Sequence, residues 1–346
     1  MVANGRVFLL AMVLVASLSL GCSSVRETTY PLARGAQDEL FIVSIADQRL
    51  TVVRDGRIDR SYIVGTAQRG VSNSPNSYAT PTCFHYVAEL YGAGQAIGTP
   101  FESHEPVLAS EVAMATAAGD SETRWPIITR IIRLAGGEYS NRLTYERLIY
   151  IHGTPFEMDL GMPASGGCIR MRSADVVDLF SLSKINSLVL ISEKGTAEAL
   201  TDLAEWRQAT GALEAAVDAG DVKAASTLCS SYALGTKGTP IDGEKAIKYC
   251  SISDSAGDSM AVALIGQLNH FGLGNVEKNL PRAVALYRDA ANGGNGLAQF
   301  RLYQMFEAGE GVEQNANASL YFLNLAAQHG YPDARRILAA SQRHQK

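Results

Sequence analysis

The chain has 346 residues, a length that suits two domains better than one. Apolar residues make up 47% and charged residues 19%, which excludes a disordered tail. The net charge is −5 and no Lys/Arg cluster stands out, so we expect no nucleic-acid partner, because phosphate binding needs a concentrated basic surface.

The first 21 residues are typical of a secretory signal peptide. Val7–Leu20 is an apolar run too short to anchor stably across a bilayer, and small residues precede position 22 as cleavage requires. The segment LSLGCSS (18–24) also resembles the lipobox of bacterial lipoproteins, with a leucine where a small residue is usual. We therefore expect a periplasmic lipoprotein, lipidated at Cys22, attached to a membrane by that lipid alone and continued by a tether over residues 22–37. A freely soluble periplasmic protein is the alternative.

Residues 38–195 are predicted to form a mostly β domain. Apolar and polar residues alternate from Phe41 to Val52, and Asp55-Gly56 is a strong signal for a two-residue hairpin turn. Further runs rich in β-branched and aromatic residues are Ile58–Val64, Cys83–Leu90, Ile127–Leu134, Leu148–Ile151 and Leu188–Ile191. A helix is expected after Arg172, with Ser173 as its N-cap.

Two side chains of this domain suit nucleophilic catalysis. His152 ends an apolar strand before Gly153, and Cys168 follows Gly166 and Gly167. A free thiol is only slightly ionised at neutral pH, so an imidazole is the usual group that activates it. The glycines allow a sharp turn whose N–H groups can face a developing oxyanion. No acidic residue adjoins His152, so a backbone carbonyl, such as that of Gly153, has to orient its ring. These residues indicate a cysteine acyltransferase or hydrolase.

Around these residues, from position 40 to 191, the sequence resembles the L,D-transpeptidase catalytic domain of the YkuD family. The family signature is a His, a gap, and then Ser/Thr-His-Gly-Cys followed by an apolar residue and Asn or Arg. The matching residues are His152, Ser165, Gly167, Cys168 and Arg170. The resemblance therefore implies the fold and the chemistry of that family.

In such an enzyme, Cys168 attacks the carbonyl of the third residue of a peptidoglycan stem tetrapeptide, and His152 acts first as base and then as acid. An amine resolves the thioester, and no cofactor or metal takes part. Ser165, Arg170 and His85 are the candidate substrate-binding residues. Support of the loop is the alternative role of Arg170, and a strand histidine satisfied by the backbone is the alternative for His85.

Two positions depart from the family pattern. Gly166 stands where a His usually precedes Gly-Cys, which puts donor binding and rate in doubt more than the chemistry. Cys83 stands where the family has Gly. We interpret Cys83 as a small core residue, and a Cys83–Cys168 disulfide that blocks the nucleophile is the alternative.

The same site admits other functions. Water as the acceptor would give an L,D-carboxypeptidase or a cross-link hydrolase, since the acyl-enzyme half of the reaction is common to all three. A second hypothesis is a weakly active envelope scaffold that works through the C-terminal part of the chain.

Residues 196–346 change period. Small-residue motifs begin at Ala219, Ala256 and Gly293, which are 37 residues apart, and Gly235, Gly272 and Gly309 repeat that spacing. Such a period marks stacked helix pairs, for example Ala261–Phe271 with Pro281–Asn292. The pattern resembles Sel-one-like repeats, relatives of the tetratricopeptide repeat, and implies an all-α solenoid that binds a protein partner.

The first repeat is predicted to carry a disulfide between Cys229 and Cys250. In the next unit Gly266 and Tyr287 occupy these positions, on facing antiparallel helices, and an oxidising compartment permits the bond. Two buried free thiols are the alternative. No Cys-x-x-Cys or paired His spacing is present, so we expect no metal site.

Overall fold

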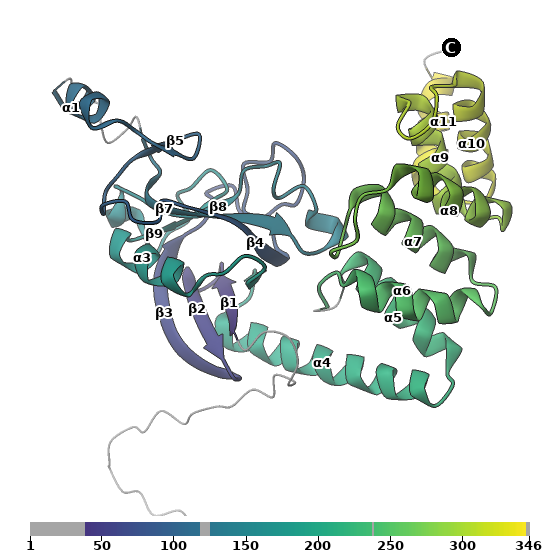
Figure 1. Ribbon diagram of the computed structural model, residues 1–346, viewed down its shortest axis with the longest axis horizontal. Helices are drawn as coiled ribbons and strands as arrows, with labels where there is room; N and C mark the ends of the chain where they lie inside the picture. The colour runs from purple at the N-terminus through teal and green to yellow at the C-terminus, as the bar shows by residue number, and fades with distance from the viewer. Residues whose placement is uncertain (1–38, 118–124, 237–238, 344–346) are drawn as a thin grey trace, which may run out of the picture.

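The computed structural model describes residues 39–117, 125–236 and 239–343. A strand-rich domain is followed by stacked helices, so the predicted multidomain architecture is confirmed (Figure 1). The expected signal peptide, the tether and the lipidation site Cys22 lie outside the described residues. Within the described ranges, no helix has both the length and the apolar character that crossing a membrane requires.

The strands of the first domain close into a barrel. Around the barrel they follow the order β1 (Glu39–Ser44), β10 (Leu188–Ser192), β4 (Cys83–Tyr91), β7 (Ile128–Gly136), β8 (Tyr150–Gly153), β9 (Ile169–Met171), β3 (Arg57–Gly65) and β2 (Arg49–Arg54). The β1–β10 and β8–β9 pairs are parallel. Because side chains alternate along a strand, Val87, Ile151 and Ile169 fill the barrel core while their neighbours face outward.

The predicted hairpin is confirmed between β2 and β3. Asp55 and Gly56 have φ angles of 48° and 75°, as a two-residue turn of type I′ requires. The expected helix is also present as α3 (Ser173–Leu182), but Ser173 is its first residue rather than its N-cap. A carboxylate oxygen of Glu157 accepts the Ser173 N–H at 3.1 Å, so the cap comes from another segment.

The segments between barrel strands carry small elements. A hairpin of β5 (Phe101–Glu102) and β6 (Glu105–Pro106), followed by α1 (Ala109–Ala117), connects β4 to β7. The short helices η1 (Tyr139–Asn141) and η2 (Glu157–Asp159) follow β7 and β8. Figure 1 shows β5 and α1 on the side of the barrel away from the stacked helices.

The helix α4 (Thr196–Asp218) links the two parts of the chain. Its first turns pack Ala199, Leu200 and Leu203 against the outer face of the barrel, where they contact Leu40 and Leu190. The rest of α4 extends away from the barrel to the first repeat (Figure 1).

The stacked helices form antiparallel pairs. They are α5 (Val222–Leu234) with α6 (Gly243–Asp254), α7 (Ser259–Phe271) with α8 (Leu280–Asn292), and α9 (Gly296–Ala308) with α10 (Ala316–Gln328), followed by α11 (Pro332–Arg343). The repeated glycines Gly235, Gly272 and Gly309 end the first helix of each pair in the left-handed conformation, with φ between 65° and 72°. This geometry explains why glycine recurs with the period of the repeat.

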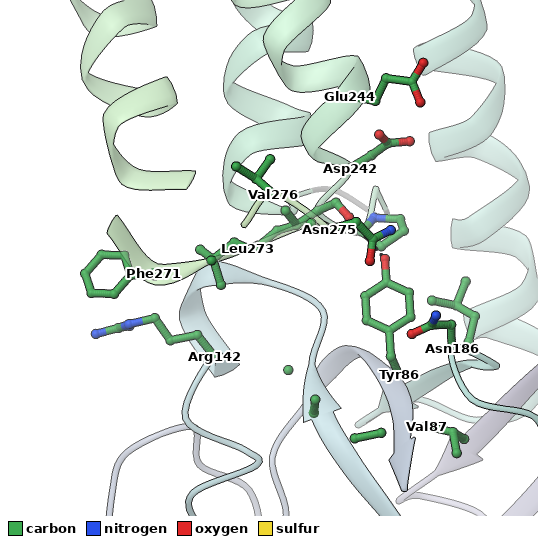
Figure 2. A pocket seen from close by; sticks show the side chains of 18 of the residues that line it. Tyr86, Val87, Arg142, Asn186, Asp242, Glu244, Phe271, Leu273, Asn275 and Val276 are labelled. Carbon is green, nitrogen blue, oxygen red and sulfur yellow. Dashed lines mark hydrogen bonds between the residues drawn. The ribbon is translucent and has the colours of Figure 1, made fainter. Parts of the chain in front are cut away.

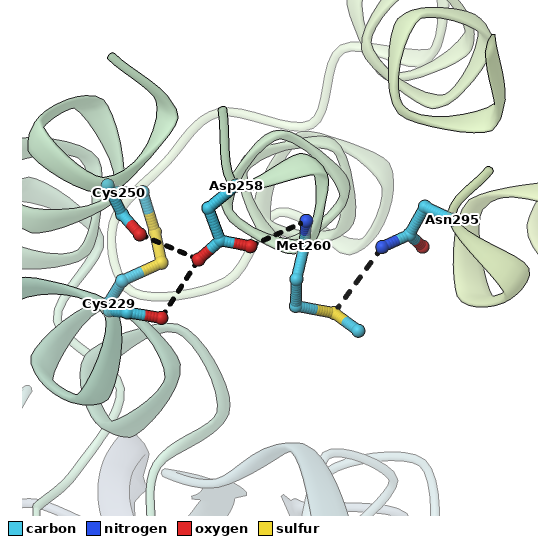
Figure 3. The surroundings of a disulfide bond; sticks show 7 residues. Cys229, Cys250, Asp258, Met260 and Asn295 are labelled. Carbon is cyan, nitrogen blue, oxygen red and sulfur yellow. Dashed lines mark hydrogen bonds between the residues drawn. A yellow bond between two sulfur atoms is a disulfide. The ribbon is translucent and has the colours of Figure 1, made fainter. Parts of the chain in front are cut away.

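The first pair is joined by a disulfide between Cys229 in α5 and Cys250 in α6 (Figure 3). In the next pair a Cβ on Gly266 would lie 2.9 Å from the Tyr287 ring, which is the close contact that the repeat register implies. The Asp258 carboxylate lies beside the bridge, where it accepts hydrogen bonds from Ser226 and Ser253 (Figure 3).

The repeats dock on the barrel at the segment that leads from β7 into η1. The Ile241 N–H donates to the Gly137 carbonyl at 2.8 Å, and the Tyr86 hydroxyl donates to the Ile241 carbonyl at 3.1 Å. The guanidinium of Arg301 donates to the Tyr139 hydroxyl and faces the rings of Tyr139 and Phe271. The two parts of the chain therefore share an interface as well as a connecting helix.

Candidate active site

The parallel pairing of β8 and β9 puts Cys168 and His152 on the same side of the barrel wall. Ile151 pairs with Ile169 and His152 with Arg170, so Cys168, one residue before β9, lies beside Tyr150. Since Ile151 and Ile169 point into the core, the alternate residues Tyr150, His152, Cys168 and Arg170 share the outer face. Diagonal neighbours on one face of a sheet lie roughly 7–8 Å apart, so the two residues are near neighbours on this face.

Cys168 is a half-buried free thiol. Its Sγ donates to the Leu148 carbonyl at 3.5 Å and packs against Phe101, Ile131 and Tyr150. Burial raises the pKa of Cys168, and the charges of Arg170 and Arg147 and the Tyr150 N–H offset this only in part. The resting nucleophile is therefore a thiol, and it needs a base before it can attack.

His152 is suited to act as that base. Its side chain is buried, with 3% exposure, and its Nδ1 hydrogen-bonds the Gly153 carbonyl at 2.8 Å, the kind of orienting contact expected from the sequence. Because a carbonyl can only accept, Nδ1 carries the proton and Nε2 keeps a free lone pair. Burial lowers the pKa of His152 to about 4, so the imidazole is neutral at physiological pH.

Ser165 shapes the turn that carries the nucleophile. Its hydroxyl donates to the Cys168 carbonyl at 2.6 Å and accepts the Gly167 N–H at 3.2 Å. Thr80 adds a hydrogen bond to the Gly167 carbonyl at 3.1 Å. The buried hydroxyl of Ser165 thus supports the turn, and substrate binding by this residue stays a prediction.

The same contacts decide which amides can hold an oxyanion. The Gly167 N–H is taken by Ser165, so Gly167 serves the turn, at a φ of 132° that favours glycine. The N–H groups of Gly166 and Cys168 donate to no described residue. These two amides are the available donors beside the nucleophile.

Arg170 is a cation without a partner among the described residues. It follows Cys168 by two positions and shares its face, yet no hydrogen bond or ion pair joins its guanidinium to the described part of the chain. Its charge lowers the pKa of both His152 and Cys168. No hydrogen bond or ion pair to a described residue supports the alternative role of Arg170 in holding the loop. A guanidinium without such a partner can bind a carboxylate.

The structure favours the alternative interpretation of His85, a strand histidine satisfied by the backbone, over a place in the substrate cleft. Its side chain is fully buried, with Nδ1 bonded to the Cys83 carbonyl at 3.0 Å and Nε2 facing the Asn141 amide at 3.3 Å. Burial lowers the pKa of His85 to about 3. His85 is therefore the backbone-satisfied strand histidine of the alternative interpretation, and it serves the fold.

Cys83 is the second free thiol of the described chain. Its Sγ lies 3.8 Å from the Thr82 hydroxyl, and burial raises its pKa to about 11. The bond between Cys83 and Cys168 that we considered as a redox block is not formed in this structure. In the described ranges, no group of three or more His, Cys, Asp or Glu side chains could hold a metal ion.

Sequence reasoning missed several residues around the thiol. Tyr150 could have been found, because it precedes His152 by two positions and must share its face of the strand. His104 and Arg147 had no such signal, since both reach the site from irregular segments. His104 contacts Tyr150, and Arg147 holds the carbonyls of Ser72 and Ala79.

A separate cavity of about 890 Å³ lies between the barrel and the repeats (Figure 2). Its wall includes Tyr86 and Arg142 from the barrel and Asp242, Glu244 and Phe271 from the repeats (Figure 2). Neither Cys168 nor His152 lines it. The cavity is a feature of the domain junction rather than of the thiol site.

Comparison with known proteins agrees with this division of the chain. Residues 38–191 match the family model of the L,D-transpeptidase catalytic domain, and residues 223–253, 259–295 and 296–331 match the Sel1 repeat. The resemblance inferred from the sequence is confirmed for both parts. The chain thus combines an L,D-transpeptidase-type domain with Sel1 repeats.

Individual relatives share only parts of the chain. DAP3-binding cell death enhancer 1 of Rattus norvegicus is 36% identical over 140 residues, which cover 38% of this chain and 27% of that protein. A Sel1 repeat protein from Oxalobacter formigenes is 27% identical, with a TM-score of 0.31, over 35% of this chain and 90% of the other. An L,D-transpeptidase from Mycobacterium smegmatis is 12% identical, with a TM-score of 0.29, over 45% and 58% of the two chains.

Proposed function

We propose that this protein is a peptidoglycan L,D-transpeptidase that forms an acyl-enzyme on Cys168 and transfers the acyl group to an amine. The observation that carries the proposal is the parallel register of β8 and β9, which places the thiol and a neutral imidazole on one face of the barrel. The match of residues 38–191 to the L,D-transpeptidase catalytic domain supports the substrate class.

The first half of the reaction begins with a rotation of the thiol. The Cys168 S–H leaves the Leu148 carbonyl and turns toward Nε2 of His152, which takes the proton as the sulfur attacks the acyl carbon. The N–H groups of Gly166 and Cys168 hold the oxyanion. His152, now an imidazolium, gives its proton to the departing amine of the terminal D-Ala, and a thioester remains on Cys168.

The second half reverses these roles. An acceptor amine loses a proton to Nε2 of His152 and attacks the thioester carbon. When the tetrahedral intermediate collapses, the C–S bond breaks and His152 returns the proton to the sulfur. The product is a new amide, and the enzyme recovers its thiol and its neutral imidazole.

Arg170 gives the donor a point of attachment. The terminal carboxylate of a stem tetrapeptide and the side-chain carboxylate of a diamino acid at its third position both lie near the bond that is cut. A free guanidinium on the nucleophile's own strand can bind either of them in a bidentate manner.

The decisive experiment uses the signal-free protein and purified muropeptides, analysed by mass spectrometry. A cross-linked dimer indicates the transferase, a trimmed tripeptide indicates the carboxypeptidase, and an unchanged substrate favours the scaffold. Cys168→Ala should abolish the product, whereas Cys83→Ala, which removes the other free thiol, should leave it. A carbapenem should add its mass at Cys168 alone, and product formation by Cys168→Ala would refute the assignment of the nucleophile.

Two further proposals concern the partner of the repeats and the attachment of the protein to a membrane. We infer that the Sel1 repeats bind a protein of the cell envelope, and that Cys22 carries a lipid that fixes the enzyme to a membrane. Radiolabelled palmitate should enter the wild-type protein and should not enter Cys22→Ala. Membrane attachment that persists in Cys22→Ala would contradict the anchor.

A further inference from the structure

The hairpin of β5 and β6 brings a histidine to the thiol site. Its two turn residues are Ser103 and His104, with φ angles of 49° and 77°. Asn and Gly usually fill such positions, because other side chains are strained at positive φ. The contacts of the His104 side chain give a reason for a histidine at this place.

The imidazole of His104 fits between two tyrosines. Its ring stacks on Tyr91 at a centroid distance of 4.7 Å and meets Tyr150 edge-on at 5.2 Å. Nε2 of His104 lies 2.5 Å from the Tyr150 hydroxyl. The histidine is thus fixed by stacking on one side and by a hydrogen bond on the other.

This arrangement rests on a network at the end of β4. The Tyr91 hydroxyl donates to Glu89 at 2.5 Å, and the same carboxylate binds Arg133 at 2.9 Å and the Tyr145 hydroxyl at 2.8 Å. Because Tyr91 is held by this network, the ring that stacks on His104 has a defined position. The hairpin therefore has a fixed docking point beside the site.

Tyr150 connects the hairpin to the nucleophile. It lies beside Cys168 in the register of β8 and β9, and both side chains pack in the cluster with Phe101 of the hairpin. Burial raises the pKa of Tyr150 to about 12, and the charge of Arg133 offsets this only in part. The phenol stays protonated and can donate a hydrogen bond at any pH at which the enzyme works.

We propose that Tyr150 is a further catalytic residue whose hydroxyl hydrogen-bonds the acyl oxygen of the substrate on Cys168, and that His104 is the positioning residue of that hydroxyl. The inference rests on the proposed function. When Nε2 of His104 carries the proton, it donates to the phenolic oxygen. The phenolic proton is then left for the acyl oxygen, where negative charge develops.

The test measures how fast a carbapenem acylates Cys168 in the signal-free protein and its variants. Tyr150→Phe keeps the ring but loses the hydroxyl, and we expect acylation roughly 100-fold slower. His104→Phe keeps the stacking but loses the donor and should slow the reaction similarly. Since the two residues act as a unit, the double variant should be no slower than Tyr150→Phe alone.

A conservative variant separates positioning from a structural role. The amide of His104→Gln can donate near the place of Nε2, so it should recover most of the rate lost in His104→Phe. Glu102→Gln, an exposed change on the same hairpin, is the matched control and should react as the wild type does. Thermal unfolding of each variant checks that the fold is intact.

The outcomes distinguish this inference from the proposed function. If a carbapenem acylates the wild type and Tyr150→Phe at the same rate, the catalytic role of Tyr150 is overturned. Equal rates for His104→Gln and His104→Phe, both below the wild type, overturn the positioning role of His104. A wild-type protein that no carbapenem acylates overturns the proposed function, and this inference with it.

Discussion

At the scale of single residues, the protonation states of the Cys168 thiol and the His152 imidazole decide how the site can react. Burial raises the pKa of Cys168 and lowers that of His152 to about 4, so both are neutral at physiological pH. A preformed thiolate–imidazolium pair would require the opposite shifts. The structure therefore favours proton transfer during attack over a standing ion pair.

This state predicts an unusual pH profile for acylation. Between about pH 5 and pH 8 the rate of carbapenem acylation should stay nearly constant, because neither group titrates there. Below about pH 4 the rate should fall about tenfold per pH unit as His152 binds a proton. Arg170→Met removes a charge that lowers the His152 pKa, so its acidic limb should move to higher pH. A tenfold fall between pH 7 and pH 5.5 in the wild type would contradict the assignment.

The two glycines before the nucleophile should respond differently to alanine. Gly167 has a φ of 132°, and a Cβ there would lie 3.2 Å from the Ile149 side chain and 3.4 Å from the Ala79 carbonyl. Gly167→Ala should cost about 1–3 kcal/mol of stability and shift the amides of the turn. We expect acylation about 100-fold slower, as after loss of an oxyanion donor.

Gly166→Ala is the matched control, since no atom lies within 4 Å of its added Cβ and its φ is not positive. Its melting temperature should stay close to that of the wild type. Equal losses of stability in both variants would show that the positive φ of Gly167 is not the cause of the loss.

At the scale of elements, periodic patterns found the strands but not their arrangement. Alternation and the Asp55-Gly56 turn located β1 to β3, because each follows from local rules. β9 has only three residues, and its parallel register with β8 depends on barrel closure. The sequence motif identified Cys168 and His152 as the candidate pair. Their position on one face of the barrel follows from the register of β8 and β9. The two interpretations of His85 could not be separated from the sequence, because alternation identifies a strand but does not tell which side chains are fully buried.

The disulfide between α5 and α6 is expected to stabilise the helical part of the chain. The bridge links residues 21 positions apart, and a loop of that size corresponds to about 3 kcal/mol on the chain-entropy estimate. The double variant Cys229→Ser, Cys250→Ser should lower the free energy of unfolding by about that amount, seen as an earlier transition in urea followed by circular dichroism. Cys83→Ser, which removes a free thiol of the barrel, controls for loss of a cysteine. An unchanged urea midpoint in the double variant would contradict a stabilising bridge.

At the scale of the whole molecule, the barrel and the repeats are built against each other. Gly235, which ends α5, approaches Gly137 and Glu138 so closely that a Cβ would lie 2.8 Å from the Gly137 carbonyl. Glu138 is itself buried at this junction, and burial raises its pKa to about 7. Two domains in such contact should unfold together rather than as independent units.

Tyr139 is the side chain through which this coupling can be tested. Its hydroxyl and ring face the Arg301 guanidinium, which is 8% exposed and forms no salt bridge with a described carboxylate. Tyr139→Ala therefore leaves a buried cation with fewer partners, and we expect a loss of about 2–3 kcal/mol. The single thermal transition expected of the wild type should split into two in this variant, because the junction loosens before either core melts.

Tyr321→Ala, on an exposed side chain of α10, is the control and should change neither the number of transitions nor their midpoints. Two separate transitions already present in the wild type would contradict a cooperative junction, and an unsplit, unshifted transition in Tyr139→Ala would show that Arg301 does not depend on this tyrosine.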